Sequence, residues 1–490
     1  MHADSAPPVG IFAAADDRGT PAQPGVCHYL TADQSYLLTG PLAPAGHANT
    51  LFAWQLATGD VILTAQILLS GTDLAADHYA GLMMIAPHDP QFMVRVVLNG
   101  QGQVLLEYQA PGSADLHQHL LIDTHAHGPP LLQIERVGGQ VAVAIAEAGA
   151  ALQATMVPLP AWHGDLQIGL CADGQLGNPR TQALAQQVRL VVPGTDTSGW
   201  PRQGFRSLLE VVEIESGKRH VVLESPTIIE APNWTPDDQA LIYNSHGRLY
   251  RFDLATRTAT EIPTDFATSN NNDHVISFDG RMLAISHHTG SERTSMVYVL
   301  PIEGGVPRQV TPNGPSYLHG WSPDGQFVVY TGLRNGDYDI YRIAVDEGAG
   351  PEEQLTDAPG LDDGPEYSPD GAWIYFNSVR SGLMQIWRMR PDGSGQEQVT
   401  DDEYNNWFPH ISPDGQSIAF ISYHQDVRPG DHPPAKRVYL RLMPASGGPI
   451  RVLAALYGGQ GSNNVPSWSP DSQRLAFVSY SATYRSQDEP

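Results

Sequence analysis

Histidine and acidic residues recur at one place in a repeated pattern in the second half of the chain. Each copy has a short polar stretch just before a turn of the Ser-Pro-Asp-Gly type, and these stretches are residues 230–234, 272–276, 317–321, 363–367, 407–411 and 464–468. His274 and His319 hold the same position in their stretches, and His410 is one step away. Imidazoles that converge with carboxylates can bind a divalent metal or act as general acids and bases.

We assign candidate roles to these residues. The candidate catalytic residues are His319, His410, Glu366 and Asp363. The candidate metal ligands are His274, His319 and His410, for a divalent ion such as Mn, Ca or Zn. The candidate ligand-binding residues are Asn272, Asp273, His287, Tyr317, Trp407, His432, Gln460 and Asn464. Side chains that line a propeller channel contact water and are polar for that reason alone. The alternative is therefore that these residues form a hydrated lining of the channel without any function.

The turns that follow the polar stretches are built to join two strands. Their anchoring residues are Thr235, Ser277, Ser322, Ser368, Ser412 and Ser469, at intervals of 42 to 57 residues. Proline presets φ for the turn and Asp-Gly supplies its tight end, so that one strand follows another directly. Apolar strands come next, as at 327–330 and 373–376. The period fits one four-stranded blade of a β-propeller.

Six copies predict six blades in a closed ring. The last copy supplies only two strands, at about 464–480, whereas two strands at 208–214 and 220–224 precede the first copy. We expect these two strands to complete the last blade, because that removes both open sheet edges. The polar stretches then lie on the innermost strands, and their alternate side chains point into the central channel.

The six turns, with third strands such as AspIleTyrArgIle at 339–343, resemble the TolB-like β-propeller family over about Phe205 to Tyr480. Six copies in register make this resemblance specific for the fold. It is not specific for function, since such propellers serve as protein-docking platforms, peptidase gates and polysaccharide lyases. A propeller oligogalacturonate lyase has a His-rich metal site at a comparable place; its Gln-x-x-His-x-His cluster is absent here, with Gln460 as a candidate substitute.

The first 195 residues have a different pattern. About nine short apolar strands are joined by hairpin signals such as AsnGlyGlnGly at 99–102. They predict a β-sandwich of the jelly-roll type, and their order resembles concanavalin-like (laminin-G-like) domains that are often attached to carbohydrate-active proteins. A linker rich in Pro, Gly and Thr is expected at 196–204, followed by the propeller at 205–490. The predicted fold class is therefore all-β.

Composition excludes some partners. The 490 residues carry a formal net charge of −26, which argues against nucleic acid and against anionic membrane surfaces. No stretch resembles a membrane span, and Met1–Gly10 has no signal-peptide pattern. We expect a soluble protein, either cytoplasmic or a mature periplasmic or secreted form. Cys27 and Cys171 are compatible with one bridge or with two free thiols.

Two functional hypotheses follow. The first is a carbohydrate-associated protein that binds a glycan or another small ligand at the propeller's central mouth; if it also cleaves the glycan, it is a polysaccharide lyase or a glycoside hydrolase. The second is a non-enzymatic docking or sensor propeller that presents its face to a protein partner. Signatures of other enzymes, such as Gly-x-Ser-x-Gly and His-Glu-x-x-His, are absent. The long polar insertion at 423–436 is the loop in which we expect ligand contacts first.

Overall fold

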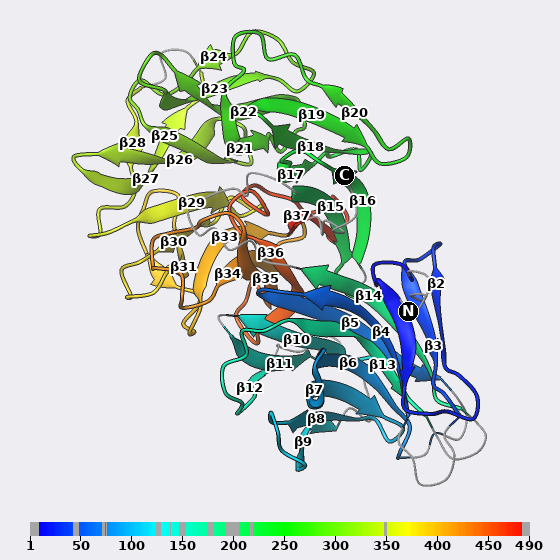
Figure 1. Cartoon of the computed structure of the whole chain (residues 1–490). Coiled ribbons are helices and arrows are strands. Elements are labelled where there is room, and N and C mark those ends of the chain that lie inside the picture. Colours follow the sequence, from blue (N-terminus) through cyan, green and yellow to red (C-terminus); the bar gives the residue numbers. More distant parts are fainter. Residues whose placement is uncertain are drawn as a thin grey trace. The chain divides into compact units, whose positions relative to one another are not determined.

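The computed structural model shows an all-β protein (Figure 1). It describes residues 9–42, 49–70, 74, 76–123, 129–137, 139–146, 153–174, 180–191, 205–215, 217, 219–346 and 350–482. The chain divides into two compact units, Met1–Thr195 and Asp196–Pro490. The linker expected at 196–204 lies outside the described residues. In the part of the chain that the structure describes, no helix is both long enough and apolar enough to cross a membrane.

The first unit consists of two seven-stranded antiparallel sheets. In spatial order the first sheet is β1 (Ala14–Arg18), β4 (Thr50–Ala57), β13 (Leu166–Asp173), β6 (Tyr79–Ala86), β7 (Asp89–Asn99), β8 (Gln103–Gln109) and β9 (Leu116–Asp123). The second is β12 (Gln153–Met156), β11 (Gln140–Ala146), β10 (Leu131–Val137), β5 (Val61–Ser70), β14 (Gln182–Val191), β3 (Ser35–Thr39) and β2 (Val26–Leu30).

Both sheets contribute to one hydrophobic core. In β5, Val61, Leu63 and Ile67 belong to this core, and in β6 Leu82 and Met84 do so at the same spacing of two. The period of two is that of a strand with one face buried. An all-β unit is therefore confirmed, while the jelly-roll assignment stays a prediction. Cys27 and Cys171 are both free thiols, and burial raises the pKa of each to about 12.

Five strands of this unit have no counterpart among the nine predicted from the sequence. They are β1, β2, β3, β9 and β12, and four of them are the edges of the two sheets. An edge strand has a neighbour on one side only, so less of its surface is buried and its apolar pattern is weaker. Strand β9 illustrates this, because Leu116 and Leu120 are both exposed.

The second unit contains five four-stranded antiparallel sheets and one three-stranded sheet. Blade one is β17 (Glu230–Trp234), β18 (Ala240–Ser245), β19 (Arg248–Asp253) and β20 (Thr258–Glu261). Blade two is β21 (Asn270–Ile276), β22 (Met282–Thr289), β23 (Thr294–Pro301) and β24 (Arg308–Gln309). Blade three is β25 (Ser316–Trp321), β26 (Phe327–Arg334), β27 (Asp337–Ala344) and β28 (Glu353–Gln354).

The remaining blades close the ring. Blade four is β29 (Asp362–Tyr367), β30 (Ile374–Ser378), β31 (Gln385–Met389) and β32 (Glu397–Gln398). Blade five is β33 (Asn405–Ile411), β34 (Ser417–Tyr423), β35 (Lys436–Pro444) and β36 (Arg451–Gly458). Blade six is β37 (Arg474–Ala482), β15 (Phe205–Glu213) and β16 (Arg219–Ser225), with one inner bridge between Trp468 and Leu475. Six blades and the predicted closure by the strands before blade one are thus confirmed.

Each Ser-Pro-Asp-Gly turn is held by its own side chains. In blade three, Ser322 Oγ donates to Asp324 Oδ1 at 2.5 Å and accepts from the Phe327 amide at 2.9 Å. Gly325 has φ +70°, in the left-handed region that favours glycine. The hydrogen bond from Ser322 lowers the pKa of Asp324. These contacts are local, so the turn forms wherever the motif occurs.

The inner strands of blades one to five each contain an irregularity. The pairing of the inner strand with its neighbour shifts register between Glu230 and Asn233 in blade one and at corresponding places in blades two to five. Ala231, Gly364 and Phe408 hold the same position in their blades and all have φ between +55° and +61°. Such a bulge re-aims the side chains around it. Each inner strand is therefore divided into two halves with different surroundings.

Candidate functional site

The first halves of the inner strands line a cavity of about 530 Å³, which we call the polar mouth. It is defined by Asn271, Asn272, Asp273, His288, Tyr317, His319, Thr331, Tyr338, Leu361, Asp363, Phe408, Gly430, His432, Gln460 and Asn464. Eight of the candidate residues come together here, namely His319, Asp363, Asn272, Asp273, Tyr317, His432, Gln460 and Asn464. They come from blades two to four, the 423–436 insertion and the segment before β37.

His319 and Asp363 form the central ion pair of the polar mouth. His319 Nε2 lies 3.2 Å from Asp363 Oδ1, which also accepts from Thr331 Oγ1 at 2.7 Å and from the Gly364 amide at 2.8 Å. Burial opposes the charge on both groups, but the pair outweighs it: the pKa of Asp363 falls to about 2 and the pKa of His319 is raised. His319 therefore remains a proton donor at a higher pH than a free imidazole does.

Two further carboxyl groups lie close by. Burial, and then the charge of Asp363, raise the pKa of Asp273 to about 6, against the opposing effect of His319. Burial, and then the charge of Asp273, raise the pKa of Glu230 to about 7. Glu230 does not line the cavity itself, but its side chain interacts with Asn272, which does. One carboxyl group in the polar mouth, Asp273, and one beside it, Glu230, thus have pKa values close to neutral pH.

Amide side chains connect blade six to the 423–436 insertion. His432 Nδ1 donates to Gln460 Oε1 at 2.5 Å, and Asn464 Nδ2 donates to the same oxygen at 3.0 Å. Gln460 Nε2 donates to Asn272 Oδ1 at 3.3 Å. His432 Nε2 lies 3.7 Å from Asp363 Oδ2. The insertion therefore reaches the acid–histidine pair directly, and Gln460 fixes the orientation of its imidazole.

Aromatic rings complete the wall. The rings of Tyr317 and Tyr338 are 6.4 Å apart, and His319 stacks on Phe408 at 6.0 Å. Burial raises the pKa of Tyr317 to about 12, so its hydroxyl stays protonated. Rings beside hydrogen-bonding groups give a cavity both an apolar and a polar side, as in small-molecule sites generally.

Two candidate catalytic residues, His410 and Glu366, do not line the polar mouth and are hydrogen-bonded between blades. His410 Nε2 donates to the Asn463 carbonyl at 2.9 Å, and His410 Nδ1 lies 2.6 Å from Glu366 Oε2. Glu366 Oε1 accepts from the Ile411 amide at 3.0 Å. Both nitrogens of His410 and both oxygens of Glu366 therefore bind neighbouring blades, and neither residue is among those that line the polar mouth.

Three other candidates also lie outside the polar mouth. His274 is fully buried, Nε2 donates to the Ile242 carbonyl at 3.2 Å, and burial lowers its pKa to about 4. His287 packs against Phe266 and Tyr298, whereas its neighbour His288 lines the cavity. Trp407 is fully buried and packs against His432.

The three candidate metal ligands consequently have different surroundings. Only His319 lines the polar mouth, because His274 and His410 are hydrogen-bonded between blades. Across the described residues, no group of three or more His, Cys, Asp or Glu side chains is placed to hold a metal ion. The residues that the geometry presents to a ligand are therefore the His319–Asp363 pair and the carboxyl and amide groups around it.

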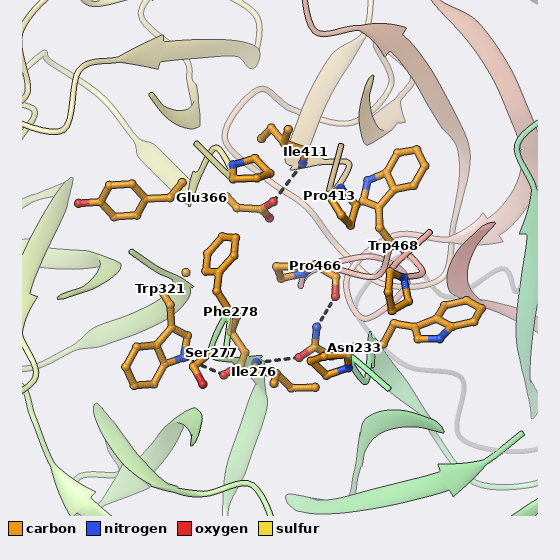
Figure 2. Close-up of a pocket in the computed structure, with 17 residues that line it drawn as sticks. Asn233, Ile276, Ser277, Phe278, Trp321, Glu366, Ile411, Pro413, Pro466 and Trp468 are labelled. Carbon is orange, nitrogen blue, oxygen red and sulfur yellow. Dashed lines mark hydrogen bonds between the residues drawn. The ribbon is translucent and has the colours of Figure 1, made fainter. Parts of the chain in front are cut away.

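The second halves of the inner strands line a different cavity of about 250 Å³, the apolar mouth (Figure 2). It is defined by Asn233, Trp234, Pro236, Val275, Ile276, Ser277, Phe278, Gly320, Trp321, Glu366, Tyr367, Pro369, Ile411, Pro413, Pro466, Trp468 and Pro470. Figure 2 shows Asn233 bonded to both Ile276 and Pro466. Phe278, which replaces the motif proline in blade two, is 45% exposed.

Sequence reasoning missed several residues of the polar mouth and its surroundings. They are Glu230, Asn271, Thr331, Tyr338, Leu361, Phe408 and Gly430. The position of Glu230 in the sequence could have identified it, because it is the first residue of its polar stretch, as Asp363 and Asn464 are of theirs. Thr331 and Tyr338 lie on β26 and β27, which are not inner strands. They line the cavity because the folded blade brings these two strands close to it, which the sequence pattern does not indicate.

Comparisons with known proteins support the propeller fold of the second unit. A model of the TolB beta propeller domain matches residues 317–430. A protein of Agrobacterium fabrum, itself uncharacterised, is 48% identical over 287 residues, which make up 58% of this chain and 96% of the relative. A solved structure from Agrobacterium tumefaciens, provisionally assigned as TolB, is 48% identical, covers 57% of this chain and 99% of its own, and has a TM-score of 0.54.

A more distant structure is that of TolB from Acinetobacter baumannii, which is 17% identical. The match covers 67% of this chain and 80% of the TolB chain, with a TM-score of 0.42. The Agrobacterium relatives are matched over almost their whole length by little more than half of this chain. The matched length is close to that of the propeller unit. Through its propeller, the chain belongs to the TolB-like β-propeller family.

Proposed function

We propose that the polar mouth binds a small ligand rich in hydroxyl groups, of the saccharide class. The observation that supports this proposal is the cavity of about 530 Å³ in which amides, carboxylates and aromatic rings converge. A sugar offers hydroxyls to amides and carboxylates and an apolar ring face to Tyr317 or Tyr338. Pockets of this size and mixed lining are typical of small-molecule sites.

The chemistry that this site can supply is proton transfer. His319 is held in place by Asp363, which raises its pKa, so it can donate a proton to a ligand oxygen. Asp273, with a pKa of about 6, can accept one near neutral pH. We propose these two as the acid and the base of a cleavage reaction on the bound saccharide. The divalent metal ion stays a prediction, which metal analysis of the purified protein tests.

We further propose that the N-terminal unit is a concanavalin-like domain that helps to hold the glycan. Two seven-stranded sheets around a common core are compatible with such a domain. Truncation of the chain to residues 205–490 tests this role, since it should weaken binding of a long polysaccharide but leave binding of a disaccharide unchanged.

Calorimetry with a panel of disaccharides tests the main proposal. Tyr338→Ala should weaken binding by about tenfold or more, because it removes a ring of the cavity wall. Tyr250→Ala is the matched control: Tyr250 lies on β19, outside the polar mouth, and its loss should leave affinity unchanged. If a folded protein binds no saccharide, the proposal fails, and docking of a protein partner becomes the favoured alternative.

A further inference from the structure

We propose that the N-terminal unit pairs with a second copy of this chain along strand β9, and that imidazoles from both copies hold one zinc ion there. The site lies in the first unit, apart from the polar mouth, and goes beyond the proposed function. Three features of β9 support it, namely its exposed edge, the order of its side chains, and the arrangement of His117 and His119.

Strand β9 is an edge that is open to further pairing. It is the last strand of its sheet and pairs only with β8 among the described strands (Figure 1). Every residue from Leu116 to Leu120 is exposed, with Leu116 at 52% and Leu120 at 57%. Natural edge strands usually block pairing with a lysine, a proline or a bulge. Residues 116–120 include no lysine or proline, and the register shift against β8 comes only after Leu120.

The order of these exposed residues makes the edge self-complementary. Residues 116–120 are LeuHisGlnHisLeu, which is the same sequence in both directions. If two copies pair antiparallel about a two-fold axis at Gln118, each leucine lies opposite a leucine and each histidine opposite a histidine. A slip of two residues in either direction places a leucine opposite Gln118 instead. The sequence therefore favours this register, with a second copy as the partner.

The leucines lie on one face of the joined sheet. Leu116, Gln118 and Leu120 alternate with the two histidines, so they point to the same side of the strand. In the paired arrangement Leu116 lies against Leu120 of the second copy, and the reverse contact repeats it. Pairing thus removes four exposed leucine side chains from water, which favours association.

The histidines lie on the opposite face and are already ordered. The rings of His117 and His119 both stack on Tyr108 of β8, at centroid distances of 4.9 and 5.7 Å. The Tyr108 hydroxyl lies 3.4 Å from His119 Nε2. When this nitrogen donates to the hydroxyl, Nδ1 of His119 is left as the atom that can bind a metal.

Two copies bring four imidazoles together. Opposed side chains of paired strands are about 5 Å apart at Cβ, and side chains two residues apart on one strand are about 7 Å apart. Imidazoles at the corners of such a rectangle can reach a common centre. Zinc takes four nitrogen or sulfur ligands in a tetrahedron, so this set suits it.

One copy alone supplies only half of this site. This agrees with the absence, in the described part of a single chain, of any group of three or more His, Cys, Asp or Glu side chains placed to hold a metal ion. Pairing completes the ligand set, and the metal in turn links the two strands. His125 and His127 follow in the sequence but lie outside the described residues, and the site does not include them.

Sedimentation velocity of the full-length, untagged protein tests the proposal. We expect a monomer in EDTA, and zinc chloride should lower the dissociation constant of the dimer by about tenfold or more, at about one zinc ion per two chains. Magnesium chloride should have no such effect, because imidazole is a poor ligand for magnesium. A protein that stays monomeric with zinc, or that forms open-ended aggregates instead of a dimer, overturns the inference.

Three variants locate the site on β9. His119→Ala removes one imidazole per copy and should abolish the effect of zinc. Leu120→Lys should also abolish the dimer, because it places a charge against Leu116 of the second copy. His28→Ala is the matched control, since His28 is an exposed histidine on β2, the edge strand of the other sheet, and its loss should leave the zinc-dependent dimer unchanged.

A zinc-dependent dimer that survives His119→Ala or Leu120→Lys overturns the inference. Both residues are exposed, so these changes should not disturb folding, and the unfolding midpoint of each variant verifies this. The outcome is distinguishable from a failure of the proposed function, because saccharide binding at the polar mouth is measured separately.

Discussion

The polar mouth and the apolar mouth are lined by different halves of the same inner strands and present different groups. At the apolar mouth the blades repeat one another, with an aromatic or isoleucine before the turn and, except for Phe278, a proline within it. At the polar mouth they differ: Asn272, Tyr317, Asp363 and Asn464 open their stretches and line the cavity, whereas Glu230 and Trp407, at the same position in their stretches, do not line it. Repetition thus accompanies the contacts that build the fold, and variation accompanies the groups offered to a ligand.

Hydrogen bonds between blades hold a layer of polar residues that do not line the polar mouth. Glu366 and His410 bind each other and the backbone of neighbouring strands, and Asn233 accepts from Ile276 and donates to Pro466. Polar groups in this layer satisfy the backbone where the bulges interrupt the pairing. They resemble catalytic groups in sequence because both kinds are histidines, acids and amides on an inner strand.

The largest expected effect lies at the apolar mouth. Trp321 is 2% exposed, and its indole N–H donates to the Val275 carbonyl at 3.0 Å. Trp321→Ala should lower the free energy of unfolding by about 3–5 kcal/mol, measured by urea denaturation. Tyr317→Ala, on the same strand but in the polar mouth, is the control and should cost less stability while weakening ligand binding. Equal losses at both positions would contradict the division between the two mouths.

An effect of the opposite sign is expected at Glu230, beside the polar mouth. Because the pKa of Glu230 is raised to about 7, its ionisation destabilises the fold as the pH rises from about 4.5 through 7. Glu230→Gln should therefore raise the free energy of unfolding by about 1–3 kcal/mol at about pH 8, and change it little at about pH 4. Urea denaturation at the two pH values measures this.

The charge of Asp363 has the opposite effect on stability to that of Glu230. Its pKa is lowered to about 2, so its ionised form stabilises the fold, and that contribution is lost as the pH falls from about 4 to 2. Asp363→Asn should consequently destabilise the protein at neutral pH. If Glu230→Gln also destabilises it at about pH 8, the assignment of an unfavourable charge to Glu230 is wrong.

The smallest expected effect is in a single turn. Ser322→Ala removes the hydroxyl that bridges Asp324 and the Phe327 amide, and should cost about 1 kcal/mol in urea denaturation without altering ligand affinity. The corresponding change at Ser412, which makes the same two contacts in blade five, should cost a similar amount. A several-fold difference between the two would mean that the turns are not equivalent.

Features that depend on local contacts could be predicted from the sequence alone. A Ser-Pro-Asp-Gly turn needs only residues within five positions, so its six copies predicted six blades and their order. The two apolar strands before the first copy predicted the closure of the ring. The shared position of the polar stretches also brought His319, Asp363 and Tyr317 into one predicted site.

Which polar residues face the cavity depends on contacts between distant parts of the chain. If side chains alternated strictly along β33, Trp407 would point into the polar mouth. The bulge in this strand instead leaves Trp407 buried and directs Phe408 to the polar mouth. His288 rather than His287 lines the cavity, because successive side chains of a strand point to opposite faces. His410 and Glu366 do not face the polar mouth, because their side chains are hydrogen-bonded to other blades. Such contacts join residues far apart in the chain, and a single repeat does not reveal them.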